Sequence, residues 1–237
     1  METPLGIEFH TFSLVGRCAR TGMLGVGITT SEIAVGSRCP FVRSKVGAVA
    51  TQAMTNPRLG TAALDLLAAG AQAVDVVSRL AEEDSHIERR QIGVVDALGR
   101  SAARTGALIH PWAGHLTGDG YVAMGNGLVG EGVVTAMAEA FQGSAEEDLE
   151  ERLMRAVEAG EEAGGEAAPF TPYHSAALVV FGDDSFSRVD LRVDDHPEPL
   201  TELRRLLELL KPRIDYYAIR ARDPDSAVRP GPPQDAR

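Results

Sequence analysis

Three glycines near the middle of the chain form the first pattern that could do chemistry. Gly125, Gly127 and Gly130 match the G-x-G-x-x-G spacing of a loop that binds dinucleotide phosphates. The pattern follows an expected strand at 120–124 and opens an expected helix at 131–141, which is the setting such a loop needs. That helix leads to another helix, so no second parallel strand can present an acidic residue to a ribose. A nucleotide-dependent enzyme is therefore the weakest interpretation of this sequence.

The histidines and cysteines give weak signals for other chemistries. A Ser-His-Asp hydrolase would carry a G-x-S-x-G turn, and the sequence has none. His110 and His115 stand in an expected loop, and His196 follows two aspartates before the last helix, a setting that suits turn or cap residues better than metal ligands. Cys18 and Cys39 fit neither a zinc spacing nor a disulfide framework. We expect no metal, no cofactor and a cytoplasmic, reducing compartment.

Composition limits the classes of partner. The 237 residues, 44% apolar and 24% charged, can bury the core of one globular domain. The formal charge of −11 leaves no basic excess for nucleic acid. We expect no signal peptide, because the first residues have neither a basic nor an apolar region, and no apolar run approaches the ~20 residues that a membrane helix needs. The acidic stretch 145–166 is interpreted as the solvated face of a helix and a loop. We expect a small-molecule substrate, no nucleic acid, no membrane and a homo-oligomer.

Hairpins and helix pairs are the elements that must position any site. Turn signals between β-rich segments predict hairpins at 9–17 with 23–30, 91–96 with 101–106, and 175–181 with 185–193. Further strands are expected at 45–53 and 120–124, and loops at 31–44 and 107–119. Helical spacing predicts pairs at 59–67 with 74–80 and 131–141 with 148–159, and a last helix at 203–210. Hairpins joined to helix pairs favour antiparallel sheets with helical layers outside them.

Several segments, taken in order, resemble one protein family. They are Thr11–Val15, Gly22–Gly27, Val46–Ala53, Trp112–His115, Gly120–Tyr121 with Gly125–Asn126, Ser175–Leu178 and Asp190–Pro197. These segments resemble the domain of unknown function 1028 family, over about Thr11 to Leu210. The resemblance implies an α+β fold of the N-terminal-nucleophile (Ntn) hydrolase type, a four-layer αββα sandwich of two antiparallel sheets. It implies no settled reaction, because the function of that family is not established.

The resemblance makes Thr11 the candidate nucleophile. Ntn hydrolases use a Thr, Ser or Cys at the start of the first strand, whose own α-amine, with a pKa of about 8, serves as the base. Ten residues precede Thr11 and the next methionine is Met23, so the mechanism requires cleavage of the His10–Thr11 bond. Otherwise Thr11 is only a β-favouring strand residue. We expect an extension at 1–10, one domain at 11–222 and a disordered tail at 223–237.

The other expected site residues follow from the needs of that chemistry. Asn126 is the candidate oxyanion donor, or else a residue that tolerates a left-handed turn. Lys45, with Arg43 second, is the candidate cation near the amine, or else a solvated loop residue. Ser13 shares a strand face with Thr11. Further residues could line a pocket or simply pack in the core: Gln52, Asn56, Trp112, His115 and Tyr121.

Two functions from different classes remain open on the sequence. The first is an Ntn-type amidohydrolase acting on a small linear or cyclic amide, with Thr11 as the nucleophile once residues 1–10 are removed. The alternative is a catalytically silent Ntn-fold protein that binds a small metabolite or acts as an assembly partner. The two functions differ in whether the Thr11 nitrogen is a free α-amine or remains part of the peptide bond to His10.

Overall fold

Two antiparallel sheets form the centre of the structure, a computed structural model that describes residues 10–168 and 174–231. The first sheet runs, in spatial order, β10 (Val189–Val193), β9 (Ser175–Phe181), β2 (Leu24–Thr30), β1 (Thr11–Arg17), β8 (Tyr121–Leu128) and β7 (Trp112–Gly118). The second runs β3 (Pro40–Arg43), β4 (Gly47–Ala53), β5 (Arg90–Asp96) and β6 (Ser101–Thr105). The expected hairpins β1–β2, β5–β6 and β9–β10 are confirmed.

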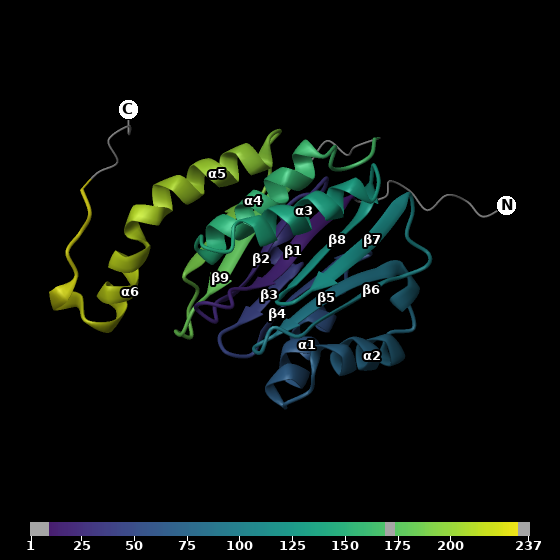
Figure 1. Ribbon diagram of the computed structural model, residues 1–237, viewed down its shortest axis with the longest axis horizontal. Helices are drawn as coiled ribbons and strands as arrows, with labels where there is room; N and C mark the ends of the chain where they lie inside the picture. Colours follow the sequence, from purple (N-terminus) through teal and green to yellow (C-terminus); the bar gives the residue numbers. More distant parts are fainter. Residues whose placement is uncertain (1–9, 169–173, 232–237) are drawn as a thin grey trace.

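Helices cover the outer face of each sheet (Figure 1). The first sheet is covered by α3 (Gly132–Gly143), α4 (Leu149–Glu162) and α5 (Pro199–Leu210), and the second by α1 (Pro57–Ala68) and α2 (Ala73–Glu83). The last helix, α6 (Ile214–Arg222), follows a 3-10 turn at Lys211–Arg213. Further 3-10 turns lie at Val35–Ser37, Ile87–Arg89 and Pro224–Ser226. The α+β fold with an αββα layer order is thus confirmed.

Alternation along β1 fixes which side chains meet the second sheet. Phe12 and Leu14 pack in the core between the first sheet and its helices. Val15 belongs to the core between the two sheets, and Ser13 bonds a residue of β4. Because successive strand side chains point to opposite faces, Thr11 also faces the second sheet. The chemistry-bearing residues of β1 therefore lie between the sheets.

Helix α4 lies close against the β1–β2 hairpin because that hairpin carries glycines. A Cβ at Gly25 would lie 2.7 Å from Leu153 Cδ1, and one at Gly16 would lie 2.9 Å from Phe141 Cζ. Any side chain there would push the helices away from the sheet. The glycines let the apolar side chains of α3 and α4 reach the strand backbone, which fixes the strand that begins at Thr11.

Two segments expected to be loops are strands instead. Trp112–Gly118 pairs with β8 through a tight turn at Asp119 and Gly120, where Gly120 has a φ of 74°. Pro40–Arg43 pairs with β4. Both lie at a sheet edge and have half-buried side chains, so their sequences lack the apolar run of a buried strand. The helix expected at 203–210 ends at Leu210 as expected but begins earlier, at Pro199; helix α6 after it was not expected, and the described part of the tail includes a helical turn at Pro224–Ser226.

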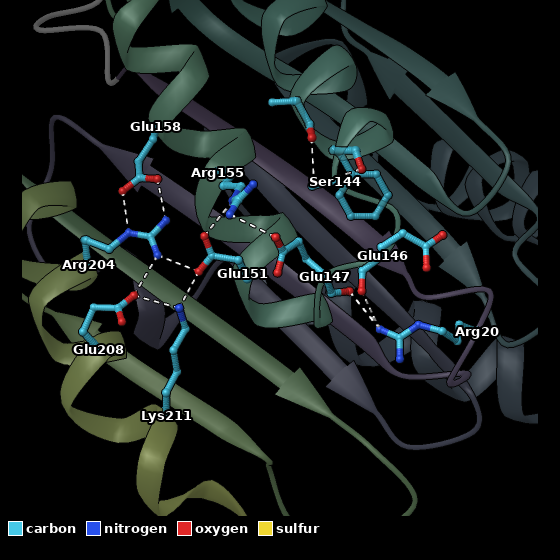
Figure 2. A network of polar contacts seen from close by, with 12 residues as sticks. Arg20, Ser144, Glu146, Glu147, Glu151, Arg155, Glu158, Arg204, Glu208 and Lys211 are labelled. Carbon is cyan, nitrogen blue, oxygen red and sulfur yellow. Dashed lines mark hydrogen bonds and ion pairs between the residues drawn. The ribbon is translucent and has the colours of Figure 1, made fainter.

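The acidic stretch 145–166 is not simply a solvated face, and the interpretation of it as one is wrong for α4. Glu150 and Glu151 are buried, and Figure 2 shows Glu151 between basic groups of three chain segments. Its carboxylate contacts Arg204 Nη1 at 2.7 Å, Lys211 Nζ at 2.6 Å and Arg155 Nε at 2.7 Å. Basic residues distant in sequence therefore tie α5 to α4.

No helix within 10–168 and 174–231 combines the length and the apolar character that crossing a bilayer requires.

Candidate functional site

Thr11 begins a central strand, and its side chain is only 4% exposed. It lies opposite Thr30 on β2 and opposite Asn126 on β8. Directly opposed residues of antiparallel strands project from the same face of the sheet. Three polar side chains are therefore gathered at one end of the first sheet. The hydroxyl oxygens of Thr11 and Thr30 are 2.8 Å apart.

A pocket of about 510 Å³ opens beside the Thr11 hydroxyl, where the space between the two sheets ends. Strand β4 reaches the pocket with Gln52 and Ala53, its last residues. The polar lining includes Thr11, Thr30, Glu32, Arg38, Gln52 and Arg90. A small molecule in this pocket would thus lie between a row of hydroxyls and a group of charged side chains.

Two of the charged groups lining the pocket have no partner of opposite charge among the described residues. Arg38 Nη2 donates to the carbonyl of Ile33 at 2.5 Å, and Glu32 Oε1 accepts from the Ile33 nitrogen at 2.7 Å. Neither forms an ion pair within the described part of the chain, whereas Arg90 pairs with Asp84 at 3.1 Å. The pocket therefore offers one guanidinium and one carboxylate to a ligand.

The Cys39 thiol also lines the pocket but is poorly suited to act as a nucleophile. Burial raises the pKa of Cys39 to about 11. The group is therefore a protonated thiol near neutral pH, and the thiolate is the reactive form. The hydroxyl of Thr11 remains the better candidate.

Asn126 carries a fully buried amide with no hydrogen-bond partner among the described residues for either Nδ2 or Oδ1. The alternative role, tolerance of a left-handed turn, does not apply. Asn126 is a strand residue, and the left-handed φ of 64° belongs to Gly127. A buried amide without partners costs about 1–3 kcal/mol, so its presence beside Thr11 calls for a function.

A chain of hydrogen bonds crosses the core from Ser13 to His115. Ser13 Oγ donates to Gln52 Oε1 at 2.7 Å, and Gln52 Nε2 donates to Gln91 Oε1 at 2.7 Å. Gln91 Nε2 then contacts the hydroxyl of Thr105 at 2.8 Å, which lies 2.8 Å from Nδ1 of His115. The chain joins strands of both sheets and fixes Gln52, which lines the pocket.

His10, the residue before Thr11, forms two hydrogen bonds with Ser31. The His10 nitrogen donates to Ser31 Oγ at 3.1 Å, and the His10 carbonyl accepts from the Ser31 nitrogen at 3.0 Å. The carbonyl also accepts from Thr30 Oγ1 at 2.6 Å. The carboxyl of Glu166 bonds Ser31 as well, and burial raises the pKa of Glu166 to about 8.

The structure does not bring the expected cations to Thr11. Lys45 pairs with Asp183 at 3.2 Å and Arg43 pairs with Asp65 at 2.9 Å, both on the exposed surface. Both residues precede the first residue of β4, and the pocket lies at the last residues of that strand. A strand of that length spans about 20 Å, so the two cations are far from Thr11. These two residues do not line the pocket.

Three other expected pocket residues have different surroundings. Asn56 begins α1, where its side chain accepts from the Arg58 nitrogen at 3.3 Å. Tyr121 starts β8 at the end opposite Asn126 and bonds Gln142 at 2.9 Å. Trp112 lies at the start of edge strand β7 and packs against the core between the first sheet and its helices. These three residues do not line the Thr11 pocket either.

The glycine pattern of the sequence does not form a phosphate-binding loop. Gly125, Gly127 and the residue between them belong to β8, which lies between β1 and β7. Their backbone is buried within a paired strand. The nucleotide-dependent interpretation is therefore wrong.

The site contains residues that sequence reasoning missed. Thr30 and Gln91 were not singled out, and neither was Arg38. A hairpin register continued from the turn at 18–23 pairs Thr11 with Thr30, so Thr30 could have been found. Gln91 and Arg38 come from distant segments, and nothing in their local sequence signals a role.

Comparisons with known proteins agree on one family. The family model described as "Family of unknown function (DUF1028)" matches residues 11–203. The chain is similar to a solved structure of protein SPO2555 from Silicibacter pomeroyi, described as DUF1028, with 32% identity and a TM-score of 0.76 over 85% of this chain and 89% of that one. It is also similar to Anbu (ancestral beta-subunit) from Yersinia bercovieri, with 9% identity and a TM-score of 0.39 over 87% and 96% of the two chains. No curated protein matches. The chain therefore belongs to the family of unknown function DUF1028.

Proposed function

We propose that this protein is an Ntn-type amidohydrolase in which Thr11 is the nucleophile once the His10–Thr11 bond is broken. The observation that carries the proposal is the position of the Thr11 hydroxyl. It lies at the start of a central strand and lines a pocket, and it is flanked by Thr30 and by the Asn126 amide, which has no hydrogen-bond partner in the described part of the chain. A nucleophile, a space for substrate and an oxyanion donor are what amide hydrolysis needs.

The nitrogen of Thr11 is oriented to act as the base after cleavage. Both backbone polar groups of His10 bond Ser31 beyond the end of β2. Backbone groups of successive strand residues point to opposite sides, so the Thr11 nitrogen points toward β8 and Asn126. A freed α-amine there, with a pKa of about 8, could accept the proton of the neighbouring hydroxyl near neutral pH.

Asn126 is the proposed oxyanion donor. Its Nδ2 has no other acceptor among the described residues, so it is available to a tetrahedral intermediate formed at Thr11. Because the amide is already buried, it needs no reorganisation when negative charge develops. Loss of one such donor lowers kcat by about 10²–10³.

The charged pocket residues favour a substrate that is itself charged. Arg38 can bind a carboxylate and Glu32 can bind an ammonium or amide N–H group, because neither has a partner of opposite charge within 10–168 and 174–231. Arg and carboxylate form strong, often bidentate hydrogen bonds. The proposed substrate is therefore a small linear or cyclic amide that carries a carboxylate.

An amide-hydrolysis screen on protein of known N-terminus tests the proposal. Linear and cyclic amides, with and without a carboxylate, would be incubated with the full chain, and intact-mass measurement on the same sample would report the fraction beginning at Thr11. We expect activity that scales with that fraction and disappears in Thr11→Ala. Thr201→Ala, an exposed change on α5, is the matched control. Activity that survives Thr11→Ala would refute the mechanism.

The alternative is a silent binding protein. The observation that favours it is that the Thr11 nitrogen is joined to His10, whose side chain is buried at 3% exposure. A chain that stays uncut and inactive, yet binds small carboxylates in calorimetry, would support this alternative. The expected homo-oligomer stays a prediction that analytical ultracentrifugation can test.

A further inference from the structure

We propose that segment 32–38 is a preformed binding site for the α-ammonium and α-carboxylate groups of an amino acid, in which Arg38 binds the carboxylate, Glu32 binds the ammonium group and Ser175 positions the segment. The segment lies between β2 and β3, and several of its residues line the Thr11 pocket. This inference names the substrate class of that pocket and rests on the proposed function for the reaction. Binding and amide hydrolysis are measured separately, so the failure of one can be told from the failure of the other.

Glu32 and Arg38 are held by the backbone of the same residue. Glu32 Oε1 accepts from the Ile33 nitrogen at 2.7 Å, and Arg38 Nη2 donates to the Ile33 carbonyl oxygen at 2.5 Å. The nitrogen and oxygen of one residue are at most about 4 Å apart, so Glu32 Oε1 and Arg38 Nη2 are no more than about 9 Å apart. The two side chains form no ion pair with each other in the part of the chain that the structure describes. Two opposite charges therefore lie close together with a gap between them.

The headgroup of an amino acid, its α-ammonium and α-carboxylate, fits this gap. The same bonds join its nitrogen to its oxygens as in a residue of the chain, so these atoms are at most about 4 Å apart. Charged hydrogen bonds of about 2.8 Å at each end extend the reach of the headgroup to about 9 Å. The bonds to Ile33 use one oxygen of Glu32 and one nitrogen of Arg38. The remaining oxygen and guanidinium nitrogens have no hydrogen bond to described residues, so they are available to the ligand.

Ser175 fixes the backbone of the segment. Its side chain is fully buried at the start of β9, where Oγ donates to the Glu32 carbonyl at 2.6 Å and accepts from the Val35 nitrogen at 2.9 Å. The Ala34 nitrogen donates to the Asp194 carbonyl at 2.9 Å, and Ala34 has a left-handed φ of 56°. A residue other than glycine is strained in that conformation, and such strain persists where the surrounding contacts hold the backbone. The segment is thus ordered before a ligand arrives, which reduces the entropy lost on binding.

The strand register places this binding site beside the candidate nucleophile. Ser175 lies opposite Thr30, and Thr30 lies opposite Thr11, so the three side chains project from the same face of the sheet. Both charged side chains and the Thr11 hydroxyl line one pocket of about 510 Å³, a usual size for a small-molecule site. A ligand whose headgroup lies at segment 32–38 can therefore present the rest of its chain to Thr11. The substrate class is an amide that carries a free amino-acid headgroup.

NMR titration of the full chain with three matched ligands tests the site. L-norvaline carries both charges, pentanoate lacks the ammonium group and butylamine lacks the carboxylate. We expect norvaline to bind about 10–100-fold more tightly than either of the others, because each hydrogen bond to a charged group contributes about that factor. The same advantage should be present in Thr11→Ala, which cannot hydrolyse an amide by the proposed mechanism.

Substitutions separate the roles of the three residues. Glu32→Gln should remove the advantage of norvaline over pentanoate, and Arg38→Gln should remove its advantage over butylamine. Ser175→Ala leaves both charges in place but releases the segment, so norvaline should lose its advantage over both ligands. A merely structural role of Ser175 would weaken all three ligands equally. Ser185→Ala, an exposed change in the turn between β9 and β10, is the matched control.

Circular dichroism establishes that each variant is folded. The inference would be overturned if norvaline bound the folded wild type no better than pentanoate and butylamine, or if its advantage survived both Glu32→Gln and Arg38→Gln. An advantage that persists in folded Ser175→Ala would overturn the role given to Ser175. Norvaline binding with the expected advantage, in a chain that hydrolyses no amide, would support the inference and count against the proposed function.

Discussion

Asn126 lies directly opposite Thr11 across the β1–β8 pair, and its buried amide has no hydrogen-bond partner among the described residues. The two side chains share one face of the sheet. In the proposed mechanism this pair would combine the nucleophile with a hydrogen-bond donor whose burial costs free energy. Stability and activity should therefore respond in opposite directions when the amide is removed.

Asn126→Leu should make the protein more stable and less active. Leucine has the same branched arrangement of side-chain heavy atoms and removes two polar atoms that have no partner among the described residues, so we expect the free energy of unfolding to rise by about 1–3 kcal/mol. Amide hydrolysis should fall by about 10²–10³ in kcat. Urea unfolding and steady-state kinetics measure the two quantities. A destabilised variant would mean that the amide has a partner after all.

Arg38→Gln should weaken the binding of carboxylate-bearing ligands. The guanidinium lines the pocket and its described contact is with a backbone carbonyl, so the substitution removes charge without breaking an ion pair among the described residues. A hydrogen bond to a charged group contributes about 1.5–3 kcal/mol, which corresponds to a loss of affinity of about 10–100-fold. Calorimetry with a small carboxylate and its neutral amide measures the effect. Arg79→Gln, on the exposed side of α2, is the control, and equal losses for both ligands would contradict the prediction.

Gln91→Met should destabilise the fold. Gln91 accepts from Gln52 at 2.7 Å and donates to the Gly125 carbonyl at 2.9 Å and to the Thr105 hydroxyl at 2.8 Å. Methionine leaves these buried groups unpaired, and each costs about 1–3 kcal/mol. We expect a loss of about 3 kcal/mol or more in the free energy of unfolding, measured in urea. A loss of less than about 1 kcal/mol in the free energy of unfolding would show that the hydrogen-bond partners of Gln91 can find other partners in the variant.

Much of the layer order could be predicted from the sequence, because hairpins and helix pairs carry local signals. The β1–β2 strands are rich in β-branched residues and end at a turn, and both helix pairs show apolar spacing. Edge strands β3 and β7 were missed because half-buried strands lack an apolar run. Strand pairing across long sequence separations, such as β1 with β8, comes from packing rather than from local sequence.

The candidate site was only partly predictable for the same reason. Of the candidate residues, Thr11 and Gln52 line the pocket, and Ser13 and His115 lie at the two ends of one hydrogen-bond chain. Lys45 sits in a turn with a left-handed φ of 60°, which sends its side chain to the surface at the far end of β4. Arg38 reaches the pocket from a 3-10 turn that the sequence did not indicate.

Glu151→Gln should destabilise the protein at neutral pH but much less in acid. Hydrogen bonds from Arg204, Lys211 and Arg155 outweigh the opposing effect of burial and lower the pKa of Glu151 to about 2 from its ordinary 4.5. A carboxyl with a lowered pKa stabilises the fold above pH 4.5 and loses that contribution as the pH falls through about 2. Urea unfolding at pH 7, 4 and 2.5 should therefore show a shrinking difference from the wild type. Glu146→Gln, a change in an exposed side chain of the same stretch, should show a small difference at every pH.

Glu166→Gln should have the opposite pH dependence. Burial raises the pKa of Glu166 to about 8 from 4.5, so the folded state holds a proton that the unfolded chain has lost between these values. Its contribution to stability is present below pH 4.5 and is lost as the pH rises through about 8. Glutamine has no proton to lose, so the melting temperature of the variant should match the wild type near pH 4.5 and exceed it increasingly up to pH 9. Glu162→Gln, exposed at the end of α4, is the control. A variant that is no more stable than the wild type at pH 9 would mean that the Glu166 carboxyl ionises freely, and that water reaches the region around Ser31.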